Sequence, residues 1–165
     1  MKKFSDFKPV RRINEQEVTL DSQKTETPDT NTETKVESTK SDVAKFISKL
    51  LESREMAQVY HWTVKGDMGS HAAHLALETY YNEVIEFIDD IVEIYQGQYE
   101  LIEEYDVIDT ADSKSKDKLD YFKEVVEFTK TERKCIKAED THMHNIIDEV
   151  IALMYKTIYK LTYNK

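Results

Sequence analysis

The chain has 165 residues, enough for one domain with a hydrophobic core, and its 23 basic and 33 acidic residues give a formal net charge of −10. This acidic balance argues against a general nucleic-acid-binding surface, which needs Lys and Arg to neutralise phosphates, and suits a protein that attracts cations. The chain has a single cysteine, Cys135, and it contains no apolar run of the roughly 20 residues that a membrane span needs. Both features predict a cytoplasmic protein.

Residues 1–40 are predicted to be a disordered polar tail. Both prolines lie there, and Val36 is the one apolar side chain between Asp21 and Asp42. Such a segment cannot bury enough apolar surface to offset the entropy lost on ordering. Its first twelve residues form a candidate DNA-binding arm. The acidic charge of the whole chain argues against DNA binding. The cations of this arm are Lys2, Lys3, Lys8, Arg11 and Arg12.

Residues 41–165 are predicted to be all-α. They contain no proline and three glycines, and their charged residues recur every three or four positions. The periodicity predicts helices over about 41–64, 70–96, 114–137 and 141–162. The second helix is expected to end at Gly97, and the connector over 98–113 has room for a short helix around "YELIEEY".

The lengths of these connections favour a ferritin-like four-helix bundle. A short turn joins the first two helices, and the longer connector would let the third helix start at the far end of the bundle. The inward face of the first helix is expected to carry Val43, Phe46, Ile47, Leu50 and Ala57.

The stretch "HWTVKGDMGSHAAH", residues 61–74, holds three of the five histidines. On a helical wheel, His61 lies on the inward line of the first helix, so it can meet His74 across the glycine turn. The second helix places Glu78, Asp89 and Glu93 in the sector of His74, at the edge of its apolar stripe. Burying an ionised carboxylate in such a position costs free energy unless the group is paired, protonated or bound to metal. Two imidazoles with carboxylates suit iron or zinc better than magnesium or calcium.

The spacing of these residues predicts a dimer if it predicts a metal site. His74 and Asp89 are fifteen residues apart on one helix, a separation of about 22 Å, which no shared metal ion can bridge. An antiparallel mate related by a two-fold axis would set its Asp89 and Glu93 against the His61 and His74 of this chain, giving two equivalent sites.

Other interpretations of the same residues need no metal. A lone inward histidine is usually a hydrogen-bonded core residue, and Asp89 with Glu93 is an ordinary solvated acid pair. Arg54 lies on the face of His61 and could neutralise an inward carboxylate. His142 and His144, about 200° apart on one helix, are assigned to surface or packing roles.

The segment "HWTVKG", followed by His74 and by "DDIVE", resembles the Dps-type mini-ferritins, the DNA-binding proteins from starved cells. That family has a His-Trp pair near the end of its first long helix, a glycine turn and then a second histidine. The acids of this chain stand 4, 15 and 19 residues after His74, as the family pattern requires. The last helix, "DTHMHNIIDEVIALMYKTIYKL", is similar to the last helix of the family, and the resemblance covers about 41–162.

The resemblance implies a ferroxidase site shared across a dimer two-fold in a twelve-subunit shell. His61, His74 and Glu78 would come from one subunit and Asp89 and Glu93 from its mate. Fe(II) would be oxidised there with hydrogen peroxide or oxygen and stored as ferric mineral, which protects against oxidative damage.

Trp62 would sit beside this site as an electron donor or a packing residue. His71 is additional to the family pattern and could be a ligand, a partner of a ligand or an exposed residue. Glu78 stands where Asp is more usual. The alternative function is a non-catalytic ferritin-like structural or interaction protein with a docking tail.

Overall fold

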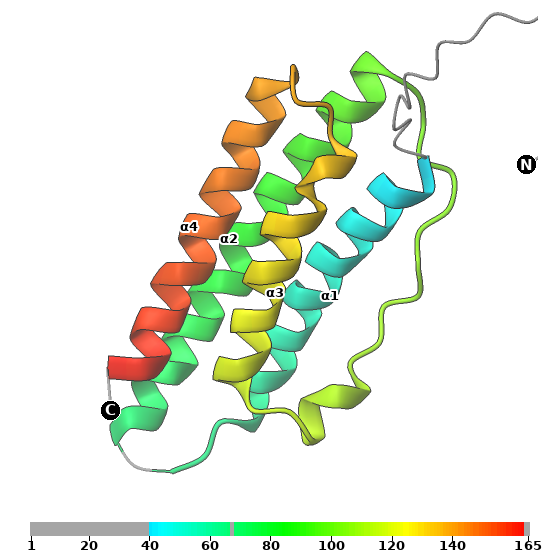
Figure 1. The fold of residues 1–165 in the computed structure, drawn as a ribbon. Coiled ribbons are helices and arrows are strands. Elements are labelled where there is room, and N and C mark those ends of the chain that lie inside the picture. The colour runs from blue at the N-terminus through cyan, green and yellow to red at the C-terminus, as the bar shows by residue number, and fades with distance from the viewer. Residues whose placement is uncertain (1–39, 67, 164–165) are drawn as a thin grey trace, which may run out of the picture. The chain divides into compact units, whose positions relative to one another are not determined.

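The structure is a computed structural model that describes residues 40–66 and 68–163, and within these residues it is all-helical, without a strand. The predicted tail and its basic arm, apart from Lys40, lie outside the described residues. The long helices are α1 (Lys40–Thr63), α2 (Met68–Gln98), α3 (Lys118–Glu132) and α4 (Thr141–Tyr163) (Figure 1). Two short 3₁₀ helices are η1 (Ala111–Lys114) and η2 (Arg133–Cys135). None of the helices described combines the length and the apolar character needed to cross a lipid bilayer.

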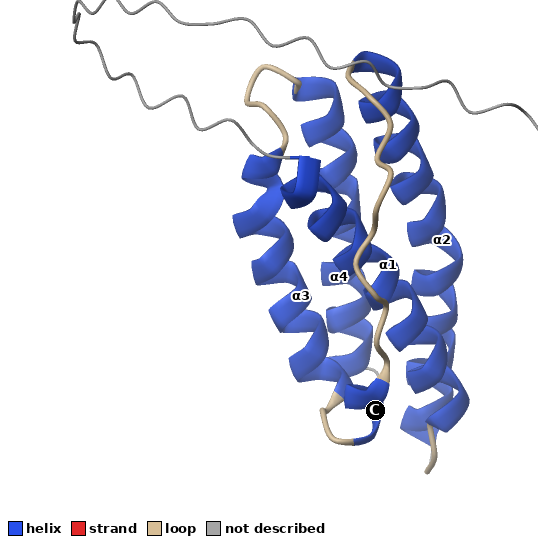
Figure 2. Ribbon diagram, turned by 90° about the vertical axis from the view of Figure 1, so that its right-hand side faces the viewer, coloured by secondary structure: helices blue, strands red, loops and turns tan. Residues whose placement is uncertain are grey.

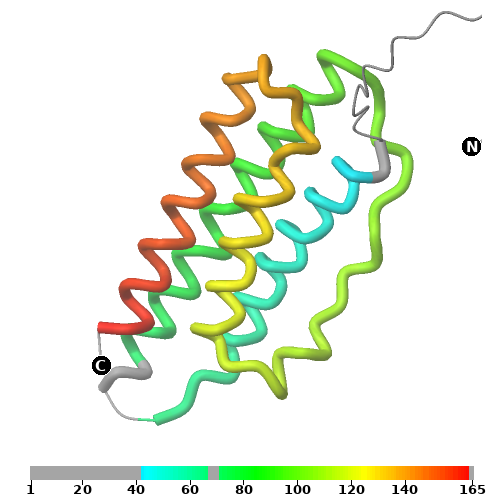
Figure 3. The backbone as a smooth tube through the Cα atoms, viewed as in Figure 1, coloured from blue at the N-terminus to red at the C-terminus, as the bar shows by residue number. Residues whose placement is uncertain are grey.

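The four long helices lie side by side, with α2 packed against α1 and α4, and α3 packed against α4 and α1. A tight turn joins α1 to α2, and Gly66 adopts a φ of 119° there, which side chains larger than hydrogen rarely tolerate. The connector over 99–117 runs the length of the helices beside α1 (Figures 1 and 2). As a result α3 begins at the end where α2 begins, and the tube in Figure 3 shows the two helices running parallel. This agrees with the expectation that the longer connector carries the chain to the far end.

The connector differs from the prediction. A short helix was expected around residues 99–105, and this prediction was wrong. This part of the connector is non-helical, and two side-chain hydrogen bonds fix it: the backbone N–H of Ile102 donates to Gln96 Oε1 at 3.0 Å, and that of Asp106 donates to Ser48 Oγ at 2.9 Å. Anchoring to two other helices replaces the internal hydrogen bonds that a helix would have made.

The helix boundaries also shift. The second helix continues through Gly97, which the sequence had marked as its end, and stops at Gln98. The third helix begins at Lys118 and not at 114, because the Asp117 side chain caps it by accepting a hydrogen bond from Leu119 N at 2.8 Å. It ends at Glu132, and the chain turns through η2 before α4 begins at Thr141, as predicted.

The core lies between the four helices. All five residues predicted for the inward face of the first helix are buried, together with apolar residues of α2, α3 and α4. Tyr80 of α2 is fully buried; its ring packs edge-on against Phe122 at 4.8 Å between ring centroids, and its hydroxyl lies 2.7 Å from Ser53 Oγ of α1. Ser53 also donates a hydrogen bond to the carbonyl of Leu50, so this polar pair is satisfied within the core.

The end of α2 is tied to the start of α4 by the buried carboxylate of Asp140. Tyr99 Oη donates to its Oδ2 at 2.5 Å, and Gln98 Nε2 donates to its Oδ1 at 2.7 Å. Burial acts to raise the pKa of Asp140, but the hydrogen bonds from Tyr99 and Gln98 outweigh it, so the pKa lies below the usual value. The hydrogen bond to Asp140 in turn raises the pKa of Tyr99 to about 12, with a smaller contribution from burial.

We expect Asp140→Asn to lower the free energy of unfolding at pH 7 by about 1–2 kcal/mol, because the ionised acceptor is lost. The lowered pKa in the folded state means that the ionised group stabilises the fold above its unfolded pKa, near 3.9, and that this contribution disappears as the pH falls through the folded value. Urea unfolding of both proteins at pH 7 and near pH 3 measures the effect. A difference that stays equal at the two pH values would contradict this role of the carboxylate.

Cys135 is buried beside α1, and burial is the main reason that its pKa is raised to about 12. We therefore expect alkylation by iodoacetamide at pH 8 to be roughly a thousandfold slower or more in the folded protein than in the urea-unfolded chain, because so little thiolate forms. Mass spectrometry of timed samples measures both rates. Equal rates would show that the thiol is accessible in the folded state.

Candidate functional site

Two histidine rings stack at the end of the bundle where α1 is joined to α2. His61 is the third residue from the end of α1, and His74 lies in the second turn of α2, across the glycine turn. Their ring centroids are 3.6 Å apart and their planes are inclined by 25°. The predicted meeting of these imidazoles is confirmed, while their role toward a metal stays a prediction.

Each imidazole is held by the backbone of the other residue. Nδ1 of His61 lies 3.0 Å from the carbonyl oxygen of His74, and Nδ1 of His74 lies 3.1 Å from the carbonyl oxygen of His61. A carbonyl oxygen can only accept, so both Nδ1 atoms carry the proton. In the neutral rings, both Nε2 atoms are then unprotonated and available as metal ligands or acceptors. The sequence placed both rings inward but gave no sign of these reciprocal bonds, which depend on how closely the two helices approach.

Tyr81 and Arg54 complete the surroundings of His61. The Tyr81 ring packs edge-on against His61 with 5.3 Å between ring centroids, and the Arg54 guanidinium lies 5.9 Å from the centre of the Tyr81 ring. Arg54 also forms an ion pair with Glu55 and donates to Gln58. The carboxylate that Arg54 pairs with is that of its partly exposed neighbour Glu55, so the predicted neutralisation of an inward carboxylate by Arg54 stays a prediction. Tyr81 was not singled out as a neighbour of the site, although its sector on the wheel adjoins that of His74.

The three predicted carboxylates differ in burial. Glu78 is half-buried one turn beyond His74, whereas Asp89 and Glu93 are exposed farther along α2. None of the three forms a hydrogen bond or an ion pair with another residue in the described part of the chain. The expected position at the edge of the apolar stripe thus holds for Glu78, while the other two carboxylates face solvent in the single chain.

The structure does not bring all five predicted residues together within one chain. The fifteen residues between His74 and Asp89 lie in one continuous helix, so about 22 Å separates them along its axis. Across residues 40–66 and 68–163, no three His, Cys, Asp or Glu side chains are grouped as metal ligands would be. A site made of all five residues requires a second chain, as the spacing predicted.

The remaining candidates lie outside the stacked pair. Trp62 follows His61 but is 68% exposed, and His71 is exposed in the first turn of α2. His142 is exposed and lies 3.1 Å from Gln98 Oε1, whereas His144 is half-buried and accepts a hydrogen bond from Arg133 Nε at Nδ1. The surface and packing roles predicted for these two histidines agree with these contacts.

The comparison with protein families matches residues 61–161 to one family, described as "Family of unknown function (DUF5856)". No curated protein and no solved structure matches the chain. The matched segment covers more than half of the chain, from His61 near the end of α1 to Leu161 in α4, and it includes both stacked histidines and the three carboxylates predicted as ligands. The chain belongs to the Family of unknown function (DUF5856).

Proposed function

We propose that the protein is a Dps-like ferroxidase and iron-storage protein with a ferritin-like four-helix bundle, acting in the cytoplasm as a homo-oligomer built from two-fold dimers, with a dodecameric shell as its complete form. Fe(II) is its substrate, and hydrogen peroxide or oxygen is the oxidant. The proposed ligands are His61, His74 and Glu78 of one subunit with Asp89 and Glu93 of its mate.

The observation that carries this proposal is the orientation of the two imidazoles. Their Nδ1 atoms are occupied by backbone carbonyls, so the Nε2 lone pair of each of the two stacked rings is left for another partner. Metal-binding histidines typically donate their second N–H to a carbonyl or carboxylate, which fixes the ring and its tautomer. Glu78, one turn beyond His74 on α2, adds a carboxylate from the same subunit.

The course of the chain supports the proposal independently. Ferritin-like bundles contain one long crossover connection, and the 99–117 connector runs the length of the helices and makes α2 and α3 parallel (Figure 1). The formal charge of −10 favours the approach of Fe(II).

The proposed chemistry balances without further reactants. Two Fe(II) ions each lose one electron, and one hydrogen peroxide molecule takes both electrons and two protons to give two water molecules. Neutral imidazoles and ionised carboxylates bind Fe(II), and the carboxylates stabilise the Fe(III) product by their charge. Because both electrons reach one peroxide molecule, no hydroxyl radical is released.

The test adds Fe(II) and peroxide to the purified protein and follows both ferric absorbance and peroxide consumption. We expect two Fe(II) oxidised per peroxide and little hydroxyl radical detected by spin trapping. His61→Ala combined with Asp89→Ala should abolish the catalysed rate. His142→Ala, which removes an exposed histidine from α4, is the matched control and should retain it. An unchanged rate in the double variant would overturn the site assignment.

A second candidate function has one observation in its favour. The reciprocal hydrogen bonds and the stacking also give each histidine a complete packing role that needs no metal. The chain would then be a ferritin-like structural or interaction protein. Oligomers that bind no iron at saturating Fe(II) would favour this function over the ferroxidase.

A further inference from the structure

The outer side of α4 near its end carries three exposed tyrosines. Tyr155, Tyr159 and Tyr163 are 48%, 60% and 71% exposed, and their spacing of four residues places them along one side of the helix. The rings of Tyr159 and Tyr163 lie 5.2 Å apart between centroids. We call these three residues the tyrosine stripe. Most monomeric proteins do not leave such a row of large aromatic side chains in contact with water.

The charge around the tyrosine stripe is opposite to that of the protein as a whole. No acidic residue occurs from Val150 to Tyr163, while Lys156 and Lys160 each directly follow a tyrosine of the stripe. Lys130 of α3, which pairs with Glu127 at 3.0 Å, also places its Nζ 3.4 Å from Tyr155 Oη. The stripe is therefore a cationic, aromatic surface on a chain with a net charge of −10.

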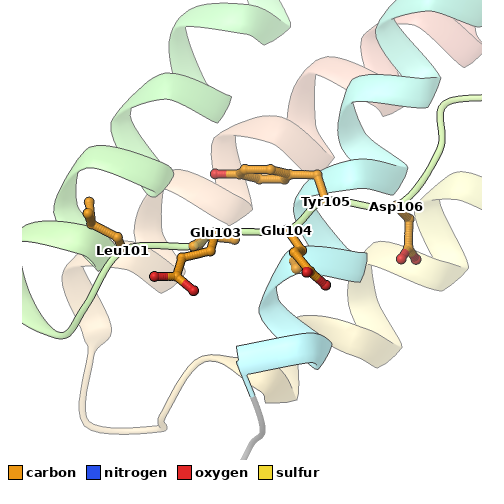
Figure 4. Close-up of a pocket in the computed structure, with 7 residues that line it drawn as sticks. Leu101, Glu103, Glu104, Tyr105 and Asp106 are labelled. Carbon is orange, nitrogen blue, oxygen red and sulfur yellow. The ribbon is translucent and has the colours of Figure 1, made fainter. Parts of the chain in front are cut away.

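A second surface of interest lies on the connector. A cavity of about 290 Å³ opens between the start of α1, at Ala44, and connector residues 101–106 (Figure 4). We call this cavity and its lining the acidic groove. Glu103, Glu104 and Asp106 supply its charge, and Figure 4 shows their side chains on one side of the connector with the Tyr105 ring on the other.

The acidic groove is also rich in exposed apolar side chains. Leu101 is 66% exposed, Tyr105 is 43% exposed, and Val107, just beyond the cavity, is 91% exposed. A cavity of roughly 150 Å³ is enough to hold a benzene ring, so a tyrosine ring fits within this volume. The groove thus offers acidic and apolar groups where the tyrosine stripe offers cations and aromatic rings.

The two surfaces lie at opposite ends of the helices and cannot meet within one chain. The stripe is at the end of α4, at the end of the helices where α1 also ends, whereas the groove is beside the start of α1 (Figure 1). The length of α1 separates them by roughly 25–30 Å. We propose that the tyrosine stripe of one chain docks in the acidic groove of a second copy. Charge complementarity selects this occupant, because an anionic nucleic acid or membrane would be repelled by the rest of the surface.

This contact is heterologous, since two different surfaces meet. Repeated from chain to chain, it closes into a ring or a shell when the rotation between neighbours allows it. It differs in kind from the two-fold contact required by the proposed metal site, and it needs no metal. Its test can therefore be made on metal-free protein, and its result does not depend on whether the protein oxidises Fe(II).

The experiment measures assembly of the full chain by sedimentation velocity and native mass spectrometry in the presence of a chelator. Lys156→Glu with Lys160→Glu, and separately Glu103→Lys with Glu104→Lys, place like charges across the contact. Each pair should raise the concentration needed for half-assembly by roughly tenfold or more. Combining all four substitutions in one chain restores opposite charges and should return that concentration to within about threefold of the wild-type value.

Lys114→Glu with Lys118→Glu is the charge-matched control outside both surfaces and should assemble like the wild type. Circular dichroism establishes that each variant keeps its helices, so a variant that fails to fold is recognised. A wild-type chain that forms no contact beyond a two-fold dimer would overturn the proposal. Folded charge-reversed variants that assemble normally would also overturn it, as would a fourfold variant that fails to regain assembly.

Discussion

Two variants that have each lost Fe(II) oxidation are expected to regain about a quarter of the wild-type rate when their subunits are mixed. The first variant, His61→Ala with His74→Ala, removes the stacked pair. The second, Asp89→Ala with Glu93→Ala, removes the exposed carboxylates at the far end of α2. We expect each variant alone to fall by about a hundredfold or more, because metal affinity collapses when ligands are removed.

The recovery follows from the two-fold geometry. In a mixed dimer, the intact histidines of one subunit face the intact carboxylates of the other, so one of the two sites is complete. Random exchange makes half of the dimers mixed, and half of their sites are intact, which gives about one quarter. A site contained within one chain could not be restored in this way, and the 22 Å between His74 and Asp89 excludes such a site on geometric grounds.

The experiment mixes the variants by unfolding and refolding them together, with native mass spectrometry to count the mixed dimers. Each variant refolded alone is the control for spontaneous recovery. Mixed dimers that stay inactive would refute the shared site, and a wild-type rate in either variant alone would remove its residues from the ligand set.

The second large effect is expected at Tyr80. Tyr80→Ala should lower the free energy of unfolding by about 3–5 kcal/mol, because it removes a fully buried ring and leaves a cavity between α1, α2 and α3. Burial of the hydroxyl is also the main reason that the pKa of Tyr80 is raised, so the side chain stays neutral in the folded protein.

Tyr80→Phe is the matched control, because it keeps the ring and removes only the hydroxyl. It should cost about 1 kcal/mol, since Ser53 still donates to the Leu50 carbonyl after Tyr80 Oη is gone. Urea unfolding followed by circular dichroism measures both variants. Equal losses in Tyr80→Ala and Tyr80→Phe would show that the hydrogen bond, and not the packing of the ring, stabilises this part of the core.

Local pattern accounts well for the helices and poorly for the connector. The apolar spacing in residues 43–57 reports directly on which side of α1 is buried, because every helix repeats every 3.6 residues. The connector residues 99–105 have a helix-like composition, yet they are non-helical. The backbone N–H of Ile102 donates to Gln96, six residues earlier at the end of α2, and that of Asp106 donates to Ser48, far away in sequence on α1. Nothing within the connector itself reveals these partners.

The candidate site also has features that the sequence predicts and features that depend on packing. The offsets from His74 to Glu78, Asp89 and Glu93 predict that one chain cannot complete the metal site, because the rise of a helix fixes their separation. The environment of Asp89 and Glu93 was harder to predict, since a residue at the edge of an apolar stripe is buried or exposed according to what packs beside it. No helix among residues 40–66 and 68–163 covers them.

The amino-acid sequence by itself determined the helical class of residues 41–163, the inward placement of His61, and the spacing that calls for a second chain, because these follow from the fixed repeat and rise of an α-helix. Only the tertiary structure decided that His61 and His74 stack with both Nδ1 atoms on backbone carbonyls, and that a cationic aromatic surface and an acidic groove lie at opposite ends of the helices. These features depend on distances between segments far apart in the chain, which packing of the whole core sets and no local pattern encodes.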